Sequence, residues 1–166
     1  MNKRPYISFV VTARNDNYGG DFIHRFNIFL KVFAELEEKN NLDAELVVVE
    51  WNPPDGNKRL YDVLVCPDSI KDRVRIITVP HGIHSALPNS HVMPVFEYIA
   101  KNVGIRRALG EYVLATNPDI LFSNELFAFL SSMRLSENCF YRADRYDINF
   151  RVPMEMQVDK QLAMCH

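Results

Sequence analysis

Two kinds of apolar pattern alternate along the chain. Four short runs are nearly all apolar and rich in β-branched residues, which is typical of strands covered on both faces of a sheet. These runs are residues 6–13, 44–50, 74–79 and 111–116. Apolar residues recur at helical spacing over residues 22–39 and 95–110, and a shorter helix is expected over residues 58–65. The alternation predicts an α/β sandwich in which helices cover both faces of a mainly parallel sheet.

Turn and capping residues support these boundaries. Residues 51–57 contain two prolines and a glycine, which end the second strand, and Gly110 is placed to end the helix before the fourth. Ser123 can cap a further helix that has Glu125 in its first turn. A long loop rich in proline, glycine and histidine is expected over residues 80–94.

Composition indicates a single globular domain. The chain has 166 residues, of which 48% are hydrophobic and 24% charged. Its net charge of -2 gives no electrostatic case for nucleic acid, and no apolar run approaches the roughly 20 residues that span a bilayer. Cys66, Cys139 and Cys165 lack CxxC spacing, which favours reduced thiols. We therefore expect a cytoplasmic protein with no membrane span and no nucleic-acid partner.

Polar residues gather where three of the predicted strands end. Thr12, Arg14, Asn15 and Asp16 follow the first strand, Glu50 and Asn52 the second, and Asn117 and Asp119 the fourth. In open parallel sheets a ligand lies outside the carboxyl ends of the strands, so these residues are candidates for a binding site. Loops collect polar residues in any case, and Asn-Pro-Asp is also a common turn sequence, so a turn explains each cluster taken alone.

The residues after the fourth strand favour a site in which a metal ion binds the phosphates of a ligand. Neither G-x-G-x-x-G nor G-x-x-x-x-G-K-[ST] occurs in the chain, so no glycine-rich loop is available for the purpose. A divalent cation that bridges phosphate oxygens to a carboxylate is the remaining way to hold a diphosphate. Asp119 supplies the carboxylate and Asn117 a carbonyl oxygen. The sequence therefore predicts a clamp for Mn²⁺ or Mg²⁺ and a diphosphate.

Three segments in this order resemble a known family. They are "ISFVVTARN", "ELVVVEWNPP" and "AKNVGIRRALGEYVLATNPDI". Together they are similar to the nucleotide-sugar-binding half of GT-A-fold glycosyltransferases, particularly family 2, over roughly residues 5–145. The resemblance implies a GT-A fold, with Asp119 as the metal ligand in the place of the D-x-D motif. It implies nucleotide-sugar contacts from Thr12, Arg14, Asn15, Glu50, Asn52, Lys101, Asn102, Arg106 and Asn117.

The chain departs from the family pattern at two positions. Asn117 stands where the first aspartate of D-x-D is expected, so that metal binding would rest on Asp119 alone. Trp51 replaces the second residue of an acidic pair and is expected to pack, or to stack near the base. The spacing of His81, His84 and His91 does not suit a zinc site, and we expect them on a mobile loop near the sugar.

The resemblance implies transfer of a sugar, with inversion, from a nucleoside-diphosphate sugar (UDP-sugar favoured) to a hydroxyl of a glycan or other acceptor. The candidates for the general base are Asp144 and Asp147, which could instead be structural or line the sugar pocket. Residues 139–143 are expected to form a further strand, and residues 154–166 a linker or one helix. We therefore predict one GT-A-like domain over residues 1–166 that lacks part of the acceptor-binding lobe.

Two alternatives stay open at the level of sequence. One is a non-catalytic nucleotide-sugar-binding module of a larger protein. The other is a nucleotidyltransferase, although the glycine-rich phosphate loop expected after its first strand is missing.

Overall fold

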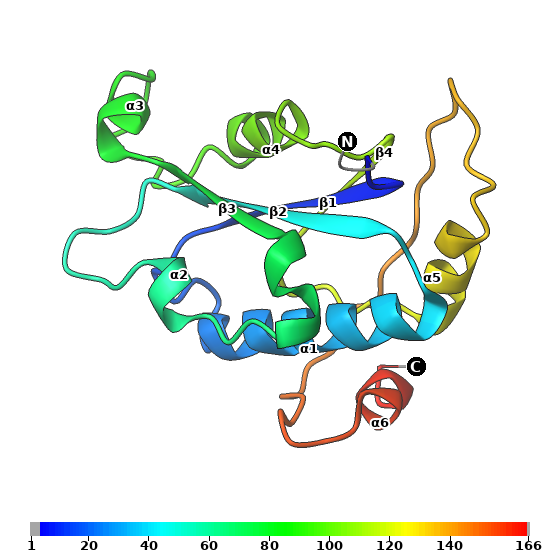
Figure 1. Ribbon diagram of the computed structural model, residues 1–166. Helices are drawn as coiled ribbons and strands as arrows, with labels where there is room; N and C mark the ends of the chain where they lie inside the picture. The colour runs from blue at the N-terminus through cyan, green and yellow to red at the C-terminus, as the bar shows by residue number, and fades with distance from the viewer. Residues whose placement is uncertain (1–3, 166) are drawn as a thin grey trace.

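The four predicted strands form one parallel sheet in the computed structural model, which describes residues 4–165 (Figure 1). The strands are β1 (Ile7–Ala13), β2 (Ala44–Trp51), β3 (Val74–Val79) and β4 (Tyr112–Thr116). Their order across the sheet is β3-β2-β1-β4, and all three pairings are parallel. The chain is therefore an α/β protein with an open sheet, as the alternation of patterns predicts.

Helices cover the two faces of the sheet unequally. The helical elements are α1 (Phe22–Asn40), α2 (Leu60–Val63), the 3-10 helix η1 (Asp68–Arg73), α3 (His81–Ser85), α4 (Glu97–Ile105), α5 (Asn124–Ser131) and α6 (Val158–Ala163). α1 lies along one face and α4 along the other, while α6 lies on the side of α1 that faces away from the sheet (Figure 1). The long helix α1 thus has neighbours on two sides, which explains why so much of it is buried.

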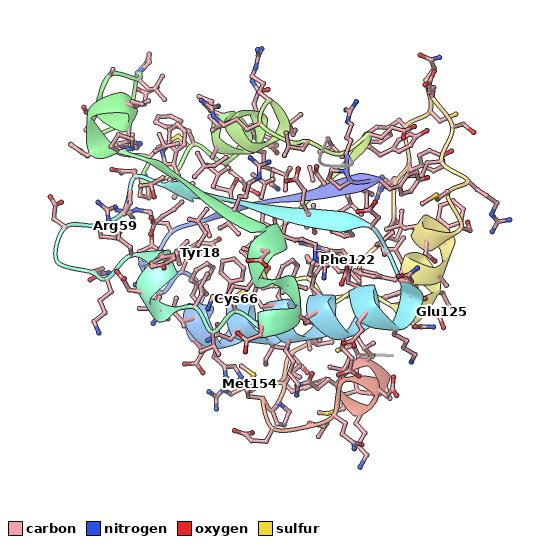
Figure 2. The ribbon with its side chains drawn as sticks, in the orientation of Figure 1. Tyr18, Arg59, Cys66, Phe122, Glu125 and Met154 are labelled. Carbon is pink, nitrogen blue, oxygen red and sulfur yellow. The ribbon has the colours of Figure 1, made fainter. Side chains whose placement is uncertain are left out.

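The larger core lies between the sheet and α1. Phe9 of β1 contacts the rings of Phe33, Phe122 and Phe127, with centroids 5.0, 5.3 and 5.5 Å apart. Figure 2 shows Phe122 in this layer, on the connection that leads from β4 to α5. Ring pairs of this kind contribute about 0.5–1.5 kcal/mol each beyond the area that they bury. The aromatic cluster therefore fixes α1 and α5 against the central strand.

The capping signal after β4 is confirmed. Ser123 precedes α5, and its hydroxyl accepts a hydrogen bond from the Leu126 amide at 3.3 Å. Glu125 lies in the first turn of the helix, where the helix dipole favours a carboxylate. The two residues mark the start of α5 as the sequence predicts.

Three secondary-structure predictions need correction. Residues 139–143 form no strand, and Phe140 is 94% exposed; the segment runs beside α5 with no strand to pair with, and apolar composition alone does not form a strand. The loop over residues 80–94 contains the short helix α3. The helix predicted over residues 95–110 is α4, which ends at Ile105.

The early end of α4 has a physical cause at the amino ends of the strands. Glu45 is 5% exposed, and its carboxylate accepts hydrogen bonds from Ser8 Oγ at 2.6 Å, the Leu109 amide at 2.5 Å and Arg75 Nε at 2.9 Å. Leu109 can donate to Glu45 only because the chain has left the helix. The buried carboxylate thus shapes the turn that leads into β4.

We expect the stability of the fold to depend on pH through Glu45. Burial raises the pKa of this carboxyl, but the hydrogen bonds that it accepts outweigh burial and hold the pKa below its ordinary value. A lowered pKa in the folded state stabilises the protein above the ordinary pKa, and this contribution is lost as the pH falls through the folded-state value. Denaturant titrations from neutral to acidic pH should therefore show a smaller acid-induced loss of unfolding free energy in Glu45→Gln. Equal pH dependence in the two proteins would contradict this role.

α4 lies unusually close to the sheet because Gly104 has no side chain. A Cβ at this position would clash with Val10 of β1 and lie 3.0 Å from Val49 Cγ2 of β2. Both valines are fully buried and β-branched, so they have little freedom to move. The glycine in the segment before β4 therefore has a packing role.

Gly104→Ala should destabilise the protein although alanine favours helices. Overpacking costs about 1–3 kcal/mol, whereas the gain in helix propensity is about 1 kcal/mol, so we expect a net loss of about 1 kcal/mol in unfolding free energy. Gly82→Ala in α3 is the matched control, because its Cβ would meet nothing within 4 Å. Denaturant unfolding should separate the two variants, and equal gains in stability would show that α4 does not approach the sheet so closely.

Candidate functional site

The strand order reverses between β1 and β4. The chain steps from β1 to β2 and β3, and then returns to place β4 on the other side of β1. In open α/β sheets the ligand lies at such a switch point, outside the carboxyl ends of the strands. Val11 pairs with Thr116, so the next residues along the two strands, Thr12 and Asn117, continue side by side into this region. The sheet thereby brings together two of the predicted site residues.

Thr12 carries a polar atom without a partner at this point. Its Oγ1 is buried and accepts or donates no hydrogen bond within residues 4–165. Because side chains alternate along a strand, Thr12 faces the same side as Val10, which packs beneath Gly104 of α4. A buried hydroxyl without a hydrogen bond is unfavourable, so Thr12 Oγ1 has hydrogen-bonding capacity left at the switch point.

Lys101 reaches the switch point from α4. Its ammonium donates to Asn117 Oδ1 at 2.8 Å and to Glu97 Oε1 at 2.8 Å, and the side chain is only 19% exposed. The predicted residues Lys101 and Asn117 are therefore in direct contact. The amide oxygen that the sequence offers to a metal is occupied by a cation of the protein itself.

Arg25 also lies at the switch point, and the sequence analysis does not name it. It lies in the first turn of α1, and its Nη1 donates to Asp119 Oδ2 in an ion pair. The same guanidinium donates to the Gly20 carbonyl at 3.1 Å. A signal was available: α1 follows β1 directly, so its first turn must begin at the carboxyl ends of the strands. Asp119 is therefore held by a guanidinium in this structure.

Arg14 and Asn52 tie together the ends of β1 and β2. Arg14 Nε donates to the Asn52 carbonyl at 2.7 Å, and Arg14 Nη1 to Asp16 Oδ2 at 2.6 Å. Asn52 has a φ of 44°, and its side chain donates to the Pro94 carbonyl at 3.3 Å and accepts from His81 Nδ1 at 3.0 Å. Asn52 therefore fixes both ends of the loop over residues 80–94, while Arg14 keeps unused donors.

Trp51 and His84 anchor the same loop from below. Trp51 is 1% exposed, and its indole Nε1 donates to His84 Nδ1 at 2.9 Å. His84 Nδ1 must then be unprotonated, so Nε2 carries the proton that it donates to the Ser90 carbonyl at 3.1 Å. Of the two roles expected for Trp51, packing is the one observed, because the ring has no exposed face to stack on a base. The loop is tied down at several points.

Glu50 lies on the other face of the sheet from Thr12. Its carboxylate accepts hydrogen bonds from the Leu60 amide at 2.7 Å and from Thr78 Oγ1 at 2.9 Å, and the residue is 1% exposed. Both carboxylate oxygens are therefore used within the protein. The expected direct contact between Glu50 and a nucleotide does not fit this arrangement, in which Glu50 positions the start of α2.

Three other predicted residues take different places. Asn15 Nδ2 donates to the Lys58 carbonyl at 2.8 Å, so that Asn15 holds the loop before α2. Asn102 and Arg106 are exposed, and at about 100° per residue they lie on the side of α4 opposite Gly104. The structure does not bring Asn102 and Arg106 to the switch point, because a helix that packs Gly104 on the sheet turns them outward.

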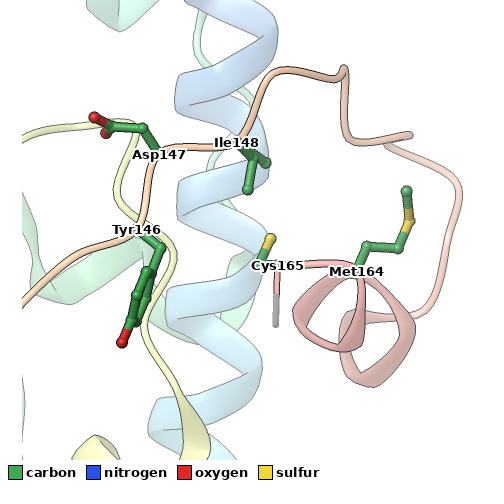
Figure 3. A pocket seen from close by; sticks show the side chains of 5 residues that line it. All are labelled: Tyr146, Asp147, Ile148, Met164 and Cys165. Atoms are coloured by element: carbon green, nitrogen blue, oxygen red, sulfur yellow. The ribbon is translucent and has the colours of Figure 1, made fainter.

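The two candidates for the general base also lie apart from this region. The segment that carries them runs on the side of the amino ends of the strands, opposite the carboxyl ends (Figure 1). Asp144 and Asp147 pair with Arg142 and Arg145 at 3.2 and 3.5 Å, and both aspartates are more than 80% exposed. Asp147 lines a hollow beside α1 and α6 together with Tyr146, Ile148, Met164 and Cys165 (Figure 3). The structure gives neither aspartate access to a ligand at the switch point.

The donor set at the switch point does not fit a divalent metal. Asn117 Oδ1 and Asp119 Oδ2 already accept hydrogen bonds from Lys101 and Arg25. Within the described residues, moreover, no group of three or more histidine, cysteine, aspartate or glutamate side chains is arranged to hold an ion. Mg²⁺ and Mn²⁺ need several free oxygen ligands, so the arrangement offers a cation too few of them.

No family model matches the chain, and no curated protein matches it. In the part of the chain from residue 4 to residue 165, no helix has the length and apolar character needed to cross a membrane.

Glu50→Ala should lower stability, because it leaves the Leu60 amide and the Thr78 hydroxyl without partners. Losing hydrogen bonds to a buried charged group costs about 1.5–3 kcal/mol, which denaturant unfolding would detect. Thr78→Val is the matched control, since it removes one bond but keeps Glu50 and should cost less. Full stability of Glu50→Ala would mean that the carboxylate does not hold α2 in place.

Proposed function

We propose that the chain binds a nucleoside-diphosphate sugar at the switch point between β1 and β4 and transfers the sugar to a hydroxyl acceptor, as a GT-A-like glycosyltransferase. The observation that carries the proposal is the position of the site. Thr12, Asn117 and Lys101 lie where an open α/β sheet receives its ligand. The segments that carry the resemblance to family 2 contribute all three residues.

The residues at the switch point suit the charge of a diphosphate. Lys101 and Arg25 bring two cations to the same turn, and Arg14 brings a third to the end of β1. Guanidinium and ammonium groups form their strongest hydrogen bonds with carboxylate and phosphate oxygens. Each of these cations is paired with a carboxylate but keeps N–H groups for a further acceptor. A UDP-sugar, with its two phosphates, offers the oxygens that these donors bind.

Transfer needs a base as well as a donor site. The acceptor oxygen forms a bond to the anomeric carbon of the sugar while the bond to the diphosphate oxygen breaks, and a carboxylate takes the proton of the acceptor hydroxyl. Positive charge near the diphosphate stabilises the negative charge that it gains as it leaves. The resemblance implies that Mn²⁺ or Mg²⁺ supplies this charge, but Asn117 and Asp119, which already accept hydrogen bonds from Lys101 and Arg25, do not fit the ion.

A second candidate is a non-catalytic nucleotide-sugar-binding module. The exposed, paired state of Asp144 and Asp147 favours it, because neither aspartate is near the switch point. Release of UDP from a UDP-sugar in the presence of hydroxyl acceptors separates the two candidates. Turnover in the range of about 1–10³ s⁻¹ is typical of enzymes, whereas a binding module shows none.

Thr12→Val tests the site itself. Valine has nearly the shape of threonine, so the strand should keep its packing and the variant should keep its stability. If Thr12 Oγ1 bonds to the bound donor, losing one hydrogen bond to a charged ligand weakens UDP-sugar binding by about tenfold or more in calorimetry. The calorimetry should be repeated with several UDP-sugars that differ in the sugar, because the sequence does not specify the donor sugar.

Thr116→Val is the control for this experiment. Thr116 lies one residue before Asn117 and, by strand alternation, on the opposite face of β4 from Asn117. UDP-sugar affinity should be unchanged in this variant. Equal affinities of the wild type and Thr12→Val would remove Thr12 from the site, and the absence of binding by any nucleoside-diphosphate sugar would refute the proposed function.

A further inference from the structure

Two cations of the protein occupy the two side chains that the sequence offers to a metal. Lys101 Nζ lies 2.8 Å from Asn117 Oδ1, and Arg25 Nη1 pairs with Asp119 Oδ2. Asn117 and Asp119 belong to one turn, in which the Ile120 amide donates to the Asn117 carbonyl at 3.4 Å. The turn therefore receives an ammonium from α4, on one face of the sheet, and a guanidinium from α1, on the other.

Both cations have hydrogen-bond donors left for a ligand. The ammonium of Lys101 has three N–H groups, and two serve Glu97 and Asn117. The guanidinium of Arg25 has five, and three serve Gly20, Tyr18 and Asp119. Lys101 is 19% exposed and Arg25 32% exposed, so each side chain is held in place yet reachable.

We propose that Arg25 and Lys101 bind the diphosphate of the nucleotide directly, in place of a divalent metal. The inference rests on the proposed function and adds to it how the charge of the donor is met. Asp119 then acts as a positioning residue, since its carboxylate orients the guanidinium of Arg25 instead of ligating an ion. The replacement of an aspartate by Asn117 fits this arrangement, because a neutral amide oxygen accepts from Lys101 without adding a second negative charge beside the phosphates.

Arg25 and Lys101 reach the phosphates with different chemistry. The planar guanidinium can form two parallel hydrogen bonds to phosphate oxygens, whereas the ammonium acts as a compact point charge. The unpaired hydroxyl of Thr12 lies on the same side of the sheet as α4 and Lys101, and is a further donor at this position. The three groups come from β1, α1 and α4, so that the site exists only in the folded chain.

Asp119→Asn gives opposite results under the two accounts of the site. If Asp119 ligates a metal, the substitution removes the charge that holds the ion, and UDP binding falls by about tenfold or more. If Asp119 only orients Arg25, the carbonyl oxygen of the asparagine can still accept the hydrogen bond from Arg25. The substitution then removes only a negative charge near the phosphates, and UDP should bind with equal or higher affinity. Asparagine is favoured in turns, so the backbone of the turn should be retained.

The experiment is calorimetric titration of the full chain with UDP, in EDTA and in excess Mn²⁺. The proteins are the wild type, Asp119→Asn, Lys101→Gln and Arg25→Gln, with Lys39→Gln as control because Lys39 lies at the far end of α1 and pairs with Asp159. Lys101→Arg tests whether another cation restores binding. Arg25→Gln can also disturb the turn over residues 18–20, to which Arg25 donates hydrogen bonds. Lys101→Gln leaves that turn intact and therefore tests the proposal independently.

We expect UDP to bind in EDTA, with about tenfold weaker binding in Lys101→Gln and in Arg25→Gln and no change in Lys39→Gln. Asp119→Asn should bind at least as tightly as the wild type. Binding that appears only with Mn²⁺ and is lost in Asp119→Asn would overturn the inference and leave the proposed function standing. Failure of UDP and UDP-sugars to bind in either buffer would overturn both.

Discussion

The position of β1 at the centre of a parallel sheet is the constraint on which the rest of the structure depends. β1 pairs with β2 on one side and β4 on the other, and its side chains alternate between two layers. Phe9 anchors the aromatic core beneath α1, whereas Val10 packs against the backbone of α4 at Gly104. Because β1 is fixed on both edges and both faces, the chain that leaves its carboxyl end starts from a rigid base.

The same alternation sorts the polar residues at the carboxyl ends. Thr12 continues the face that carries Val10, which α4 covers, and the register of β1 with β4 places it beside Asn117. Glu50 of β2 lies on the opposite face, where it bonds to Leu60 and Thr78. Thr12 and Glu50 look equivalent in the sequence, because each lies at the end of a strand. In the structure Thr12 faces the switch point, whereas Glu50 holds the start of α2.

Charge at the switch point is balanced in pairs. Arg25 faces Asp119, Lys101 faces Glu97, and Arg14 faces Asp16. Each pair is partly exposed, so water screens it, and each contributes little to stability by itself. In each pair the carboxylate holds the cation in position and offsets its repulsion from the neighbouring cations. An anionic ligand can then be met by groups that are already oriented, which lowers the cost of ordering them on binding.

Sequence by itself determined the local structure. Apolar runs and helical spacing give the four strands, α1 and α4, and Ser123 gives the start of α5, because periodicity and capping depend on neighbours a few residues apart. It also determined that polar residues would collect at one edge of the sheet, because the carboxyl ends of parallel strands all lie at the same edge. Only the tertiary structure decided which residues meet at this edge. The ion pair of Arg25 with Asp119 joins positions that are 94 residues apart in the sequence. Asn102 and Arg106 point outward because Gly104, on the opposite side of α4, packs on the sheet. Residues 139–143 form no strand for the same reason, because a strand requires a neighbour that local composition does not supply.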